Sequence, residues 1–472
     1  MQKIITMKKL QLFICILALC SCEGIVDDID KNPNSITVDQ IEPQQVLPAA
    51  MVANTLVQLG HLQRISGLYS GQYKAYQSLY LNIYSYNITS EESESTWNRA
   101  YINVLPQLRY IRENVPDDRL LVGITGVLEA QCIGSIASFF GDVPYSQASN
   151  PEVEDPTFDG QEAVLNGLIG MLDQSISDLN AAASKTLAVD IYHGGNKGKW
   201  IAAANTLKAR YYMLLRNYGA ALTAAQNGIT SSEDDMLFVP VGADGVAGSK
   251  NTFWTILNGS RTGDIGSRET YLTDLLDPAN SESRNNAKTD ENARFLYYQI
   301  NDASSSGNMG VVNEFEPQPL VTYRENQLIL AEAAARSQGF DAGLQALNDY
   351  RAYLNDGGYL NANFASEVFN YEPYDASDFA AGGIENADNI SPDVALLREI
   401  VEEAYVSGYM SITPFDLVRR VRGEGDISIP FPTNTPTETR QPERLIYPTD
   451  ELRTNSNAPA EPGLFTKTPV NQ

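Results

Sequence analysis

Tyrosines and amides are concentrated in one short stretch of the chain, residues 69–87. Its six tyrosines are Tyr69, Tyr73, Tyr76, Tyr80, Tyr84 and Tyr86. The first four recur at helical spacing, which favours packing in a core or in a groove wall. Tyr84 and Tyr86 lie beyond that pattern, and their alternate spacing predicts one shared side of an extended segment. Aromatic rings cover flat apolar faces and amides bind hydroxyl groups. The ligand-binding candidates here are therefore Tyr84, Tyr86, Asn82 and Asn87.

A second candidate group lies in residues 251–264, NTFWTILNGSRTGD. Trp254 stands in a Gly-, Asn- and Ser-rich stretch that predicts a loop, where a large ring has little reason to be part of a core. The polar residues Asn258 and Arg261 follow it closely. Trp97 and Trp200, in contrast, lie on apolar helical stripes and are expected to pack.

The sequence offers little for catalysis or metal binding. It has only two histidines, His61 and His193, and it lacks the motifs of phosphate loops, dinucleotide sites, nucleophile elbows and zinc proteases. Its 59 acidic residues give many carboxylate pairs by chance, and none is marked as a glycosidase pair. The acidic stretch with Asp274 and Asp277 offers calcium-type ligands without further support. We predict no enzymatic activity, and we assign no cofactor and no metal site.

The overall charge excludes one class of partner. The chain has 33 Lys and Arg against 59 Asp and Glu, a net charge of −26 at pH 7. A nucleic acid would be repelled, and no basic run offsets this charge, so nucleic-acid binding is excluded. Three of the four cysteines lie within the first 22 residues, which excludes a disulfide scaffold. The remaining one, Cys132, is expected to be a buried free thiol on a helix.

The first residues carry an export signal. Lys8 and Lys9 precede an apolar run that is too short to span a membrane as a helix but typical of a signal peptide. The run ends in Leu19-Cys20-Ser21-Cys22, the pattern of a bacterial lipobox, which predicts cleavage after residue 21 and acylation of Cys22. An ordinary secretory signal with an incidental cysteine is the alternative. Residues 22–36 would then form an acidic linker behind the lipid anchor.

Helical periodicity dominates the rest of the chain. Apolar stripes come in close pairs, at 97–114 with 121–140, 161–183 with 199–218, and 323–337 with 342–355. Paired helices of this kind favour a mainly α, tetratricopeptide-like helical-repeat scaffold. Long irregular stretches lie between them, at 228–322, 357–391 and 423–472, with short strands expected near Phe238-Val239 and Ile427–Phe431.

Several motifs occur together in an order that is typical of one family. They are Asn32-Pro33-Asn34, Gly141-Asp142-Val143-Pro144-Tyr145, the helix Lys199-Trp200 to Arg210, Pro414-Phe415-Asp416-Leu417 to Arg420, and Arg444-Leu445-Ile446-Tyr447-Pro448. With a lipobox before them, they resemble the SusD/RagB family of outer-membrane glycan-binding lipoproteins. The family often has Asp-Pro-Arg in mid-chain, whereas here Asp277-Pro278 is followed by Ala279. The motifs themselves suggest turns and helix packing rather than ligand contact.

The resemblance implies a fold, a location and a role. We expect a single SusD-like domain over 37–472, with loop insertions at about 228–322 and 357–391. The protein would be lipid-anchored in the outer membrane and face the cell exterior. It would bind oligosaccharide without cleaving it and deliver it to a SusC-like TonB-dependent transporter. The alternative is a peptide binder, or a ligand-poor lid and assembly partner of such a transporter.

Overall fold

The computed structural model describes residues 42–242, 248–302 and 307–472. The chain divides into one unit that ends at Val46 and a second unit from Leu47 to Gln472. In the first, the described part is a short 3-10 turn, Pro43–Val46. Cys22 and the acidic linker lie outside the described residues, so lipidation and the predicted domain limits stay predictions. The second unit holds every element discussed below.

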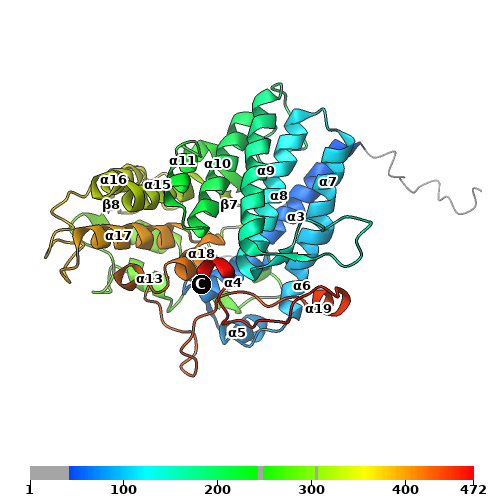
Figure 1. The fold of residues 1–472 in the computed structure, drawn as a ribbon. Coiled ribbons are helices and arrows are strands. Elements are labelled where there is room, and N and C mark those ends of the chain that lie inside the picture. Colours follow the sequence, from blue (N-terminus) through cyan, green and yellow to red (C-terminus); the bar gives the residue numbers. More distant parts are fainter. Residues whose placement is uncertain (1–41, 243–247, 303–306) are drawn as a thin grey trace, which may run out of the picture. The chain divides into compact units, whose positions relative to one another are not determined.

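One group of long helices packs side by side around α8 (Figure 1). Its members are α3 (Leu47–Gln58), α7 (Leu105–Asn114), α8 (Arg119–Phe140), α9 (Gln161–Ala181) and α10 (Lys197–Leu214). Helix α8 begins at an Asp118 cap, which accepts a hydrogen bond from the Leu121 N–H, and it ends at Gly141, where φ is +83°. Among the described residues, α8 alone has the length and apolar composition of a membrane span, and 94% of its most apolar stretch is buried inside the protein.

A second group of helices continues from the first (Figure 1). Its members are α11 (Tyr218–Ala225), α15 (Tyr323–Gln338), α16 (Phe340–Asn355), α17 (Pro392–Ser407) and α18 (Thr413–Arg420). Helix α11 packs on both α10 and α15, and α15 packs on α16 and α17. Arg210 on α10 reaches Glu325 on α15 at 2.5 Å, an ion pair that ties the two groups together. The mainly helical fold and its helix pairs are confirmed.

One predicted helix is wrong in its extent. The stripe over 199–218 is split into α10 and α11, because Arg216 adopts a left-handed φ of +55°. Asn217 then caps α11 by accepting a hydrogen bond from the Ala220 N–H.

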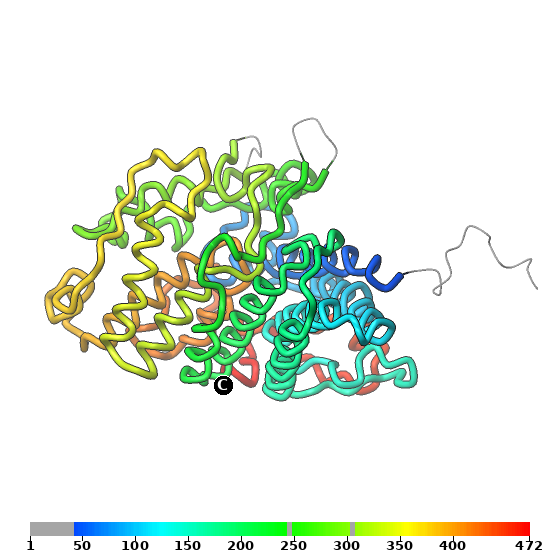
Figure 2. Tube along the Cα trace, turned by 90° about the horizontal axis from the view of Figure 1, so that it is seen from above, coloured from blue at the N-terminus to red at the C-terminus, as the bar shows by residue number. Residues whose placement is uncertain are grey.

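The irregular stretches contain short elements of their own. Residues 228–322 hold the helices α12 (Thr252–Leu257), α13 (Tyr271–Leu276) and α14 (Asn292–Tyr297). Figure 2 shows residues 357–391, in yellow, running outward from α16 before the chain returns in α17. Helix α19 (Thr449–Thr454) lies near the C-terminus, and Cys132 is a buried free thiol on α8, as expected.

The strands of the described chain form two-stranded antiparallel pairs. They are β1 (Lys74–Ala75) with β5 (Ile265–Gly266), β2 (Val143–Pro144) with β3 (Phe158–Asp159), β4 (Met236–Phe238) with β7 (Gln318–Val321), and β6 (Thr289–Asp290) with β8 (Asn370–Tyr371). The strand expected near Phe238 is confirmed. The one expected at Ile427–Phe431 is wrong, because a 3-10 turn over Gly425–Ile427 is followed by irregular chain.

The tyrosine-rich stretch differs from its prediction in two ways. Helix α4 (His61–Tyr69) ends at the first tyrosine, and Gly71, with φ of +75°, turns the chain into β1. The later tyrosines lie on α5 (Ser78–Tyr84), so the extended segment is wrong. Tyr86 follows with a left-handed φ of +65°.

A π-helical turn interrupts the helix that follows. Helix α6 (Glu91–Asn98) runs directly into the π-turn η3 (Arg99–Val104), which continues as α7. Extra residues in a helical turn re-aim the side chains at that point, and such turns are frequent at functional sites. Arg99 is the first residue of this turn.

Candidate functional site

Of three cavities in the described part of the chain, the most spacious is an open cleft of about 770 Å³. Small-molecule sites typically have volumes of about 300–1,000 Å³. The cleft therefore has room for a ligand of several rings. Its walls come from α3, α4, α5, α6, the π-turn η3, α12 and the chain around residues 248–252.

A short strand pair brings the distant segments of the cleft together. Lys74 of β1 pairs with Gly266 of β5, and the Tyr76 N–H donates to the Asp264 carbonyl at 2.9 Å. The Gln77 side chain adds a hydrogen bond to the Thr262 carbonyl at 3.0 Å. These contacts fix the start of α5 against the end of the α12 segment.

Two arginines in the cleft have no carboxylate partner among the described residues. The Arg64 Nε donates to the Tyr80 hydroxyl, and the guanidinium lies 5.7 Å from the centre of the Tyr80 ring. The Arg99 Nη1 donates to the Ser95 carbonyl at 3.3 Å. Burial, and then the charge of Arg64, lowers the pKa of the Arg99 guanidinium. The two positive charges are thus close enough to repel each other.

His61 lies in the cleft wall beside these arginines. The residue is only 8% exposed, and its Nε2 has no hydrogen-bond partner among the described residues. Burial, followed by the charges of Arg64, Arg99 and Arg261, lowers the pKa of His61 to about 3. The imidazole is therefore neutral at physiological pH, and its unpartnered nitrogen can donate or accept one hydrogen bond.

The other charged groups of the cleft are Lys250, Glu91 and Glu92. The Lys250 Nζ is paired with Glu314 and lies 4.3 Å from the centre of the Phe315 ring. Glu92 accepts a hydrogen bond from the Thr89 N–H at 2.8 Å. No ion pair joins either glutamate to an arginine of the cleft within the described chain. The cleft can thus hydrogen-bond a polar ligand through Arg64, Arg99 and His61. We call these groups uncommitted, because each has at least one nitrogen atom without a partner among the described residues.

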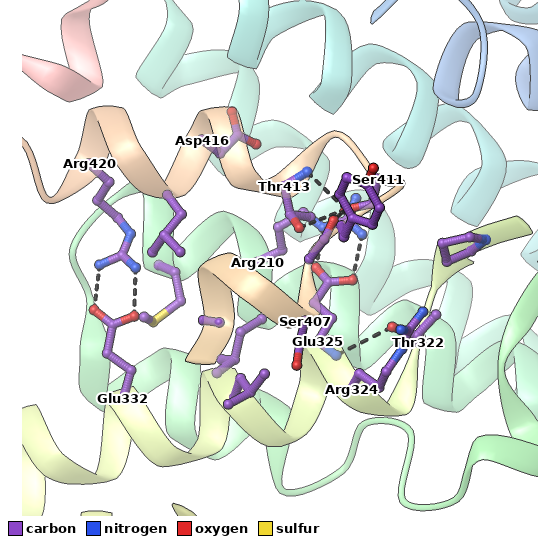
Figure 3. Close-up of a pocket in the computed structure, with 18 of the residues that line it drawn as sticks. Arg210, Thr322, Arg324, Glu325, Glu332, Ser407, Ser411, Thr413, Asp416 and Arg420 are labelled. Atoms are coloured by element: carbon purple, nitrogen blue, oxygen red, sulfur yellow. Dashed lines mark hydrogen bonds and ion pairs between the residues drawn. The ribbon is translucent and has the colours of Figure 1, made fainter. Parts of the chain in front are cut away.

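A smaller cavity between α10, α15 and α18 is not a comparable site. Its volume is about 90 Å³, which is room for a few water molecules. Figure 3 shows that its charges face each other: Arg420 lies against Glu332 and Arg210 against Glu325. Because these charges satisfy one another, the cavity is part of the helix packing.

A third cavity, of about 460 Å³, lies beside η3 and the chain around 148–156. Trp97 and Tyr101 form part of its wall with several prolines. The Trp97 indole N–H donates to Glu451 at 3.3 Å, and the Tyr101 hydroxyl donates to the Pro144 carbonyl at 2.8 Å. The polar ends of both rings are thus already bonded within the protein. Trp97 packs, as predicted.

The predicted candidates at 82–87 lie on α5 or just after it, outside the lining of the large cleft. Asn82 and Asn87 are exposed, and Tyr84 is half-buried at the end of α5. The Tyr86 hydroxyl accepts a hydrogen bond from the Asn434 N–H at 2.8 Å, and its ring packs on Tyr69 and Phe465. Leu79 is the residue of α5 that lines the cleft. A ligand role for these four candidates stays a prediction.

The second predicted group lies closer to the cleft. Trp254 is half-buried on α12, so the predicted loop is wrong at this point, and Lys250 lies 5.8 Å from its ring centre. Thr252, Thr255 and Ile256 of the same helix line the cleft, whereas Trp254 and Asn258 are not in its lining. The Arg261 guanidinium lies 5.9 Å from the Tyr80 ring centre and 3.6 Å from Asp264.

His61, Arg64 and Arg99 were not among the site residues predicted from the sequence. His61 and Arg64 are three apart and share one face of α4, which was the available signal. It carried little weight, because arginines on acidic helical proteins usually belong to ion pairs. Within the described residues there is also no group of three or more His, Cys, Asp or Glu that could hold a metal ion.

Several motif residues have structural roles, as expected. The Asp142 carboxylate accepts a hydrogen bond from the Gln161 N–H at 2.8 Å and so holds the start of α9. Asp416 and Arg419 form an ion pair at 2.5 Å on α18. Trp200 is fully buried, and its indole N–H donates to Asp190 at 2.7 Å.

Comparison with known proteins identifies a family and a shared fold. Residues 33–357 match the family model SusD-like, described as starch-binding and associating with the outer membrane. No curated protein sequence matches the chain significantly. Similar solved structures include a SusD/RagB family protein from Bacteroides thetaiotaomicron, with a TM-score of 0.65, 19% identity, and coverage of 88% of this chain and 95% of that chain. A chitin-binding SusD homologue from Flavobacterium johnsoniae has a TM-score of 0.63, 17% identity, and coverage of 90% and 98% respectively.

Proposed function

The chain belongs to the SusD-like family, and from this premise we propose that it is a surface-exposed outer-membrane lipoprotein that binds oligosaccharides. It hands them to a SusC-like TonB-dependent transporter without cleaving them. Cys22 carries the lipid, and the acidic residues that follow it form the tether. The described helices form the scaffold that holds the binding cleft.

The observation that carries this proposal is the chemistry of the 770 Å³ cleft. A sugar presents apolar faces and a rim of hydroxyl groups, and it is bound by apolar walls with a few placed polar groups. Leu79 and Ile256 supply apolar wall, while Arg64, Arg99 and the neutral His61 supply uncommitted hydrogen-bonding groups. The family description and the chitin-binding relative support the same class of ligand.

Binding without cleavage is supported by the same groups. Glycoside hydrolysis uses two carboxyl groups on either side of the scissile bond, one of them with a raised pKa. The carboxylates that line the cleft, Glu91 and Glu92, are neighbours on one turn of α6. They therefore do not flank a bound chain from opposite sides.

The cleft is tested by filling it. Thr255 is exposed on α12 and lines the cleft, and its hydroxyl bonds only to the Asn251 carbonyl one turn earlier. We expect Thr255→Trp to abolish oligosaccharide binding in calorimetry against a panel of starch and chitin fragments. Thr223→Trp is the matched control, because Thr223 is also exposed, lies on α11 and makes the same kind of bond to Gly219.

The outcomes separate the proposal from its alternative. Unchanged glycan binding by Thr255→Trp would place the site elsewhere, and Trp254→Ala then tests the neighbouring candidate. A wild-type protein that binds peptide mixtures but no glycan would support the peptide-binding alternative instead. Membrane attachment is tested separately, because Cys22→Ala should move the protein out of the membrane fraction.

A further inference from the structure

Arg64 and Arg99 differ from most arginines of the described chain because they have no carboxylate partner. The chain carries a net charge of −26, and most arginines of the described chain are held by carboxylates. Arg64 and Arg99 instead face a concave space, each with N–H groups that have no partner in the described residues. Neutral hydroxyl groups would satisfy these donors only in part.

The positive charges of Arg64 and Arg99 also repel each other. Arg99 begins the π-turn η3, while Arg64 comes from α4, so two separate elements place like charges at one cleft. Holding like charges together costs free energy unless a counter-charge lies near them. An anion bound between the guanidinium groups would remove this repulsion and form charge-assisted hydrogen bonds, which are the stronger kind.

The remaining groups of the cleft do not supply that counter-charge. Glu91 and Glu92 line the same cleft, but neither comes within ion-pair distance of the arginines. Lys250 adds a further positive charge, which Glu314 neutralises. His61 adds none at neutral pH, and its unpartnered Nε2 remains for a hydroxyl group.

We propose that the cleft selects oligosaccharides that carry an anionic group, with Arg64 and Arg99 binding that group and His61 bonding an adjacent hydroxyl. This inference rests on the proposed function and narrows its ligand class. Two common sugar substituents share the required chemistry, the carboxylate of a uronic acid and a sulfate ester. Planar guanidinium groups suit both, because each offers two or more oxygens to paired N–H donors.

The experiment uses matched ligand pairs that differ only in charge. One pair is tetragalacturonate with its fully methyl-esterified form. The other is a sulfated galactan tetrasaccharide with its desulfated form. Calorimetry on the full chain should show at least tenfold tighter binding of the charged member in one pair, and the pair that responds identifies the anion. Added NaCl should weaken that binding.

Variants assign the effect to the two arginines. The double variant Arg64→Gln, Arg99→Gln should weaken binding of the charged ligand at least tenfold more than it weakens binding of the matched neutral ligand. Arg453→Gln is the control, because Arg453 is exposed on α19, outside the cleft, and makes no ion pair within the described chain. It changes the net charge by one unit and should leave both affinities within twofold.

Each outcome bears on one proposal or both. Equal affinity within both ligand pairs, or equal losses for charged and neutral ligands in the double variant, would overturn the anionic preference. If only neutral starch or chitin fragments bind, the anionic preference fails while the proposed function stands. If no oligosaccharide binds wild type at all, both fail.

Discussion

Replacing His61 by glutamine should make the protein less sensitive to acid. In the folded protein the pKa of His61 is about 3, because the imidazole is buried and lies near three arginines. In the unfolded chain the pKa returns to about 6.5. Between these values the unfolded state binds a proton that the folded state does not, so stability falls as the pH falls through this range.

The magnitude follows from the two pKa values. At pH 7.5 His61 is neutral in both states and contributes nothing to the pH dependence. A pH of 4.5 lies about two units below the unfolded pKa of His61 and above its folded pKa. Protonation of His61 therefore stabilises the unfolded state at this pH by about 2–3 kcal/mol. Other groups that titrate differently in the two states, such as Asp235 with a pKa raised by burial to about 7, act equally in wild type and variant. The difference between the two proteins therefore isolates His61.

Urea unfolding at pH 7.5 and at pH 4.5 measures this difference. The loss of unfolding free energy between the two pH values should be about 2–3 kcal/mol larger for wild type than for His61→Gln. The variant His193→Gln should show the same sign, because burial lowers the pKa of His193 to about 4. Equal acid sensitivity of wild type and His61→Gln would mean that His61 has an ordinary pKa in the folded protein. The inference that burial and the nearby arginines keep it neutral would then be wrong.

Four further predictions concern the scaffold. Gly134→Ala should destabilise the fold by about 1–3 kcal/mol in thermal unfolding, because its Cβ would lie 2.1 Å from the Tyr211 hydroxyl oxygen. Gly170→Ala on α9 should stabilise it by about 0.5–1 kcal/mol, since nothing lies within 4 Å of the new Cβ. Glu332→Gln should cost about 3–5 kcal/mol in urea unfolding, because it leaves a buried arginine of α18 without its counter-charge. Burial raises the pKa of the Cys132 thiol, so thiol reagents should modify it only after unfolding.

The helical scaffold was predictable because apolar residues that recur at helical spacing lie on the buried face of a helix. The prediction failed where a single residue changes the backbone direction. At 199–218 the stripe continues through Arg216, whose left-handed φ ends one helix before the next begins. A non-glycine residue in that conformation leaves no mark in the apolar pattern.

The tyrosine stretch illustrates a different error. Helical spacing from Tyr69 onward suggested one helix, but Ser70 and Gly71 end α4 and turn the chain into a strand. Glycine just after a helix is a common stop signal, so this turn was available from the sequence. Tyr73 and Tyr76 flank β1, so their helical spacing is a coincidence, whereas Tyr80 and Tyr84 do lie on a helix, α5, which reaches the cleft through Leu79.

The cleft itself could not be assembled from the sequence. Its walls come from residues near 60, 95 and 250, and their meeting depends on a strand pair of two residues on each side, Lys74–Ala75 with Ile265–Gly266. Pairs this short follow from tertiary packing rather than from strand propensity. The pair lies in or next to the two segments predicted from the sequence, 69–87 and 251–264, whereas the arginines on α4 and at η3 became visible only in the structure.

Because the chain is so acidic, the absence of a carboxylate partner for Arg64 and Arg99 among the described residues is informative. With 59 carboxylates against 33 basic side chains, an arginine placed at random on this protein has many potential partners. Elsewhere the fold uses them, as in the cavity where Arg420 and Arg210 each face a glutamate. At the large cleft the charge of Arg64 acts on Arg99, and the histidine that lines the same cleft is neutral. A folded chain that retains an unbalanced positive site amid so much negative charge bears a stability cost there, and a ligand that brings the missing charge would recover it on binding.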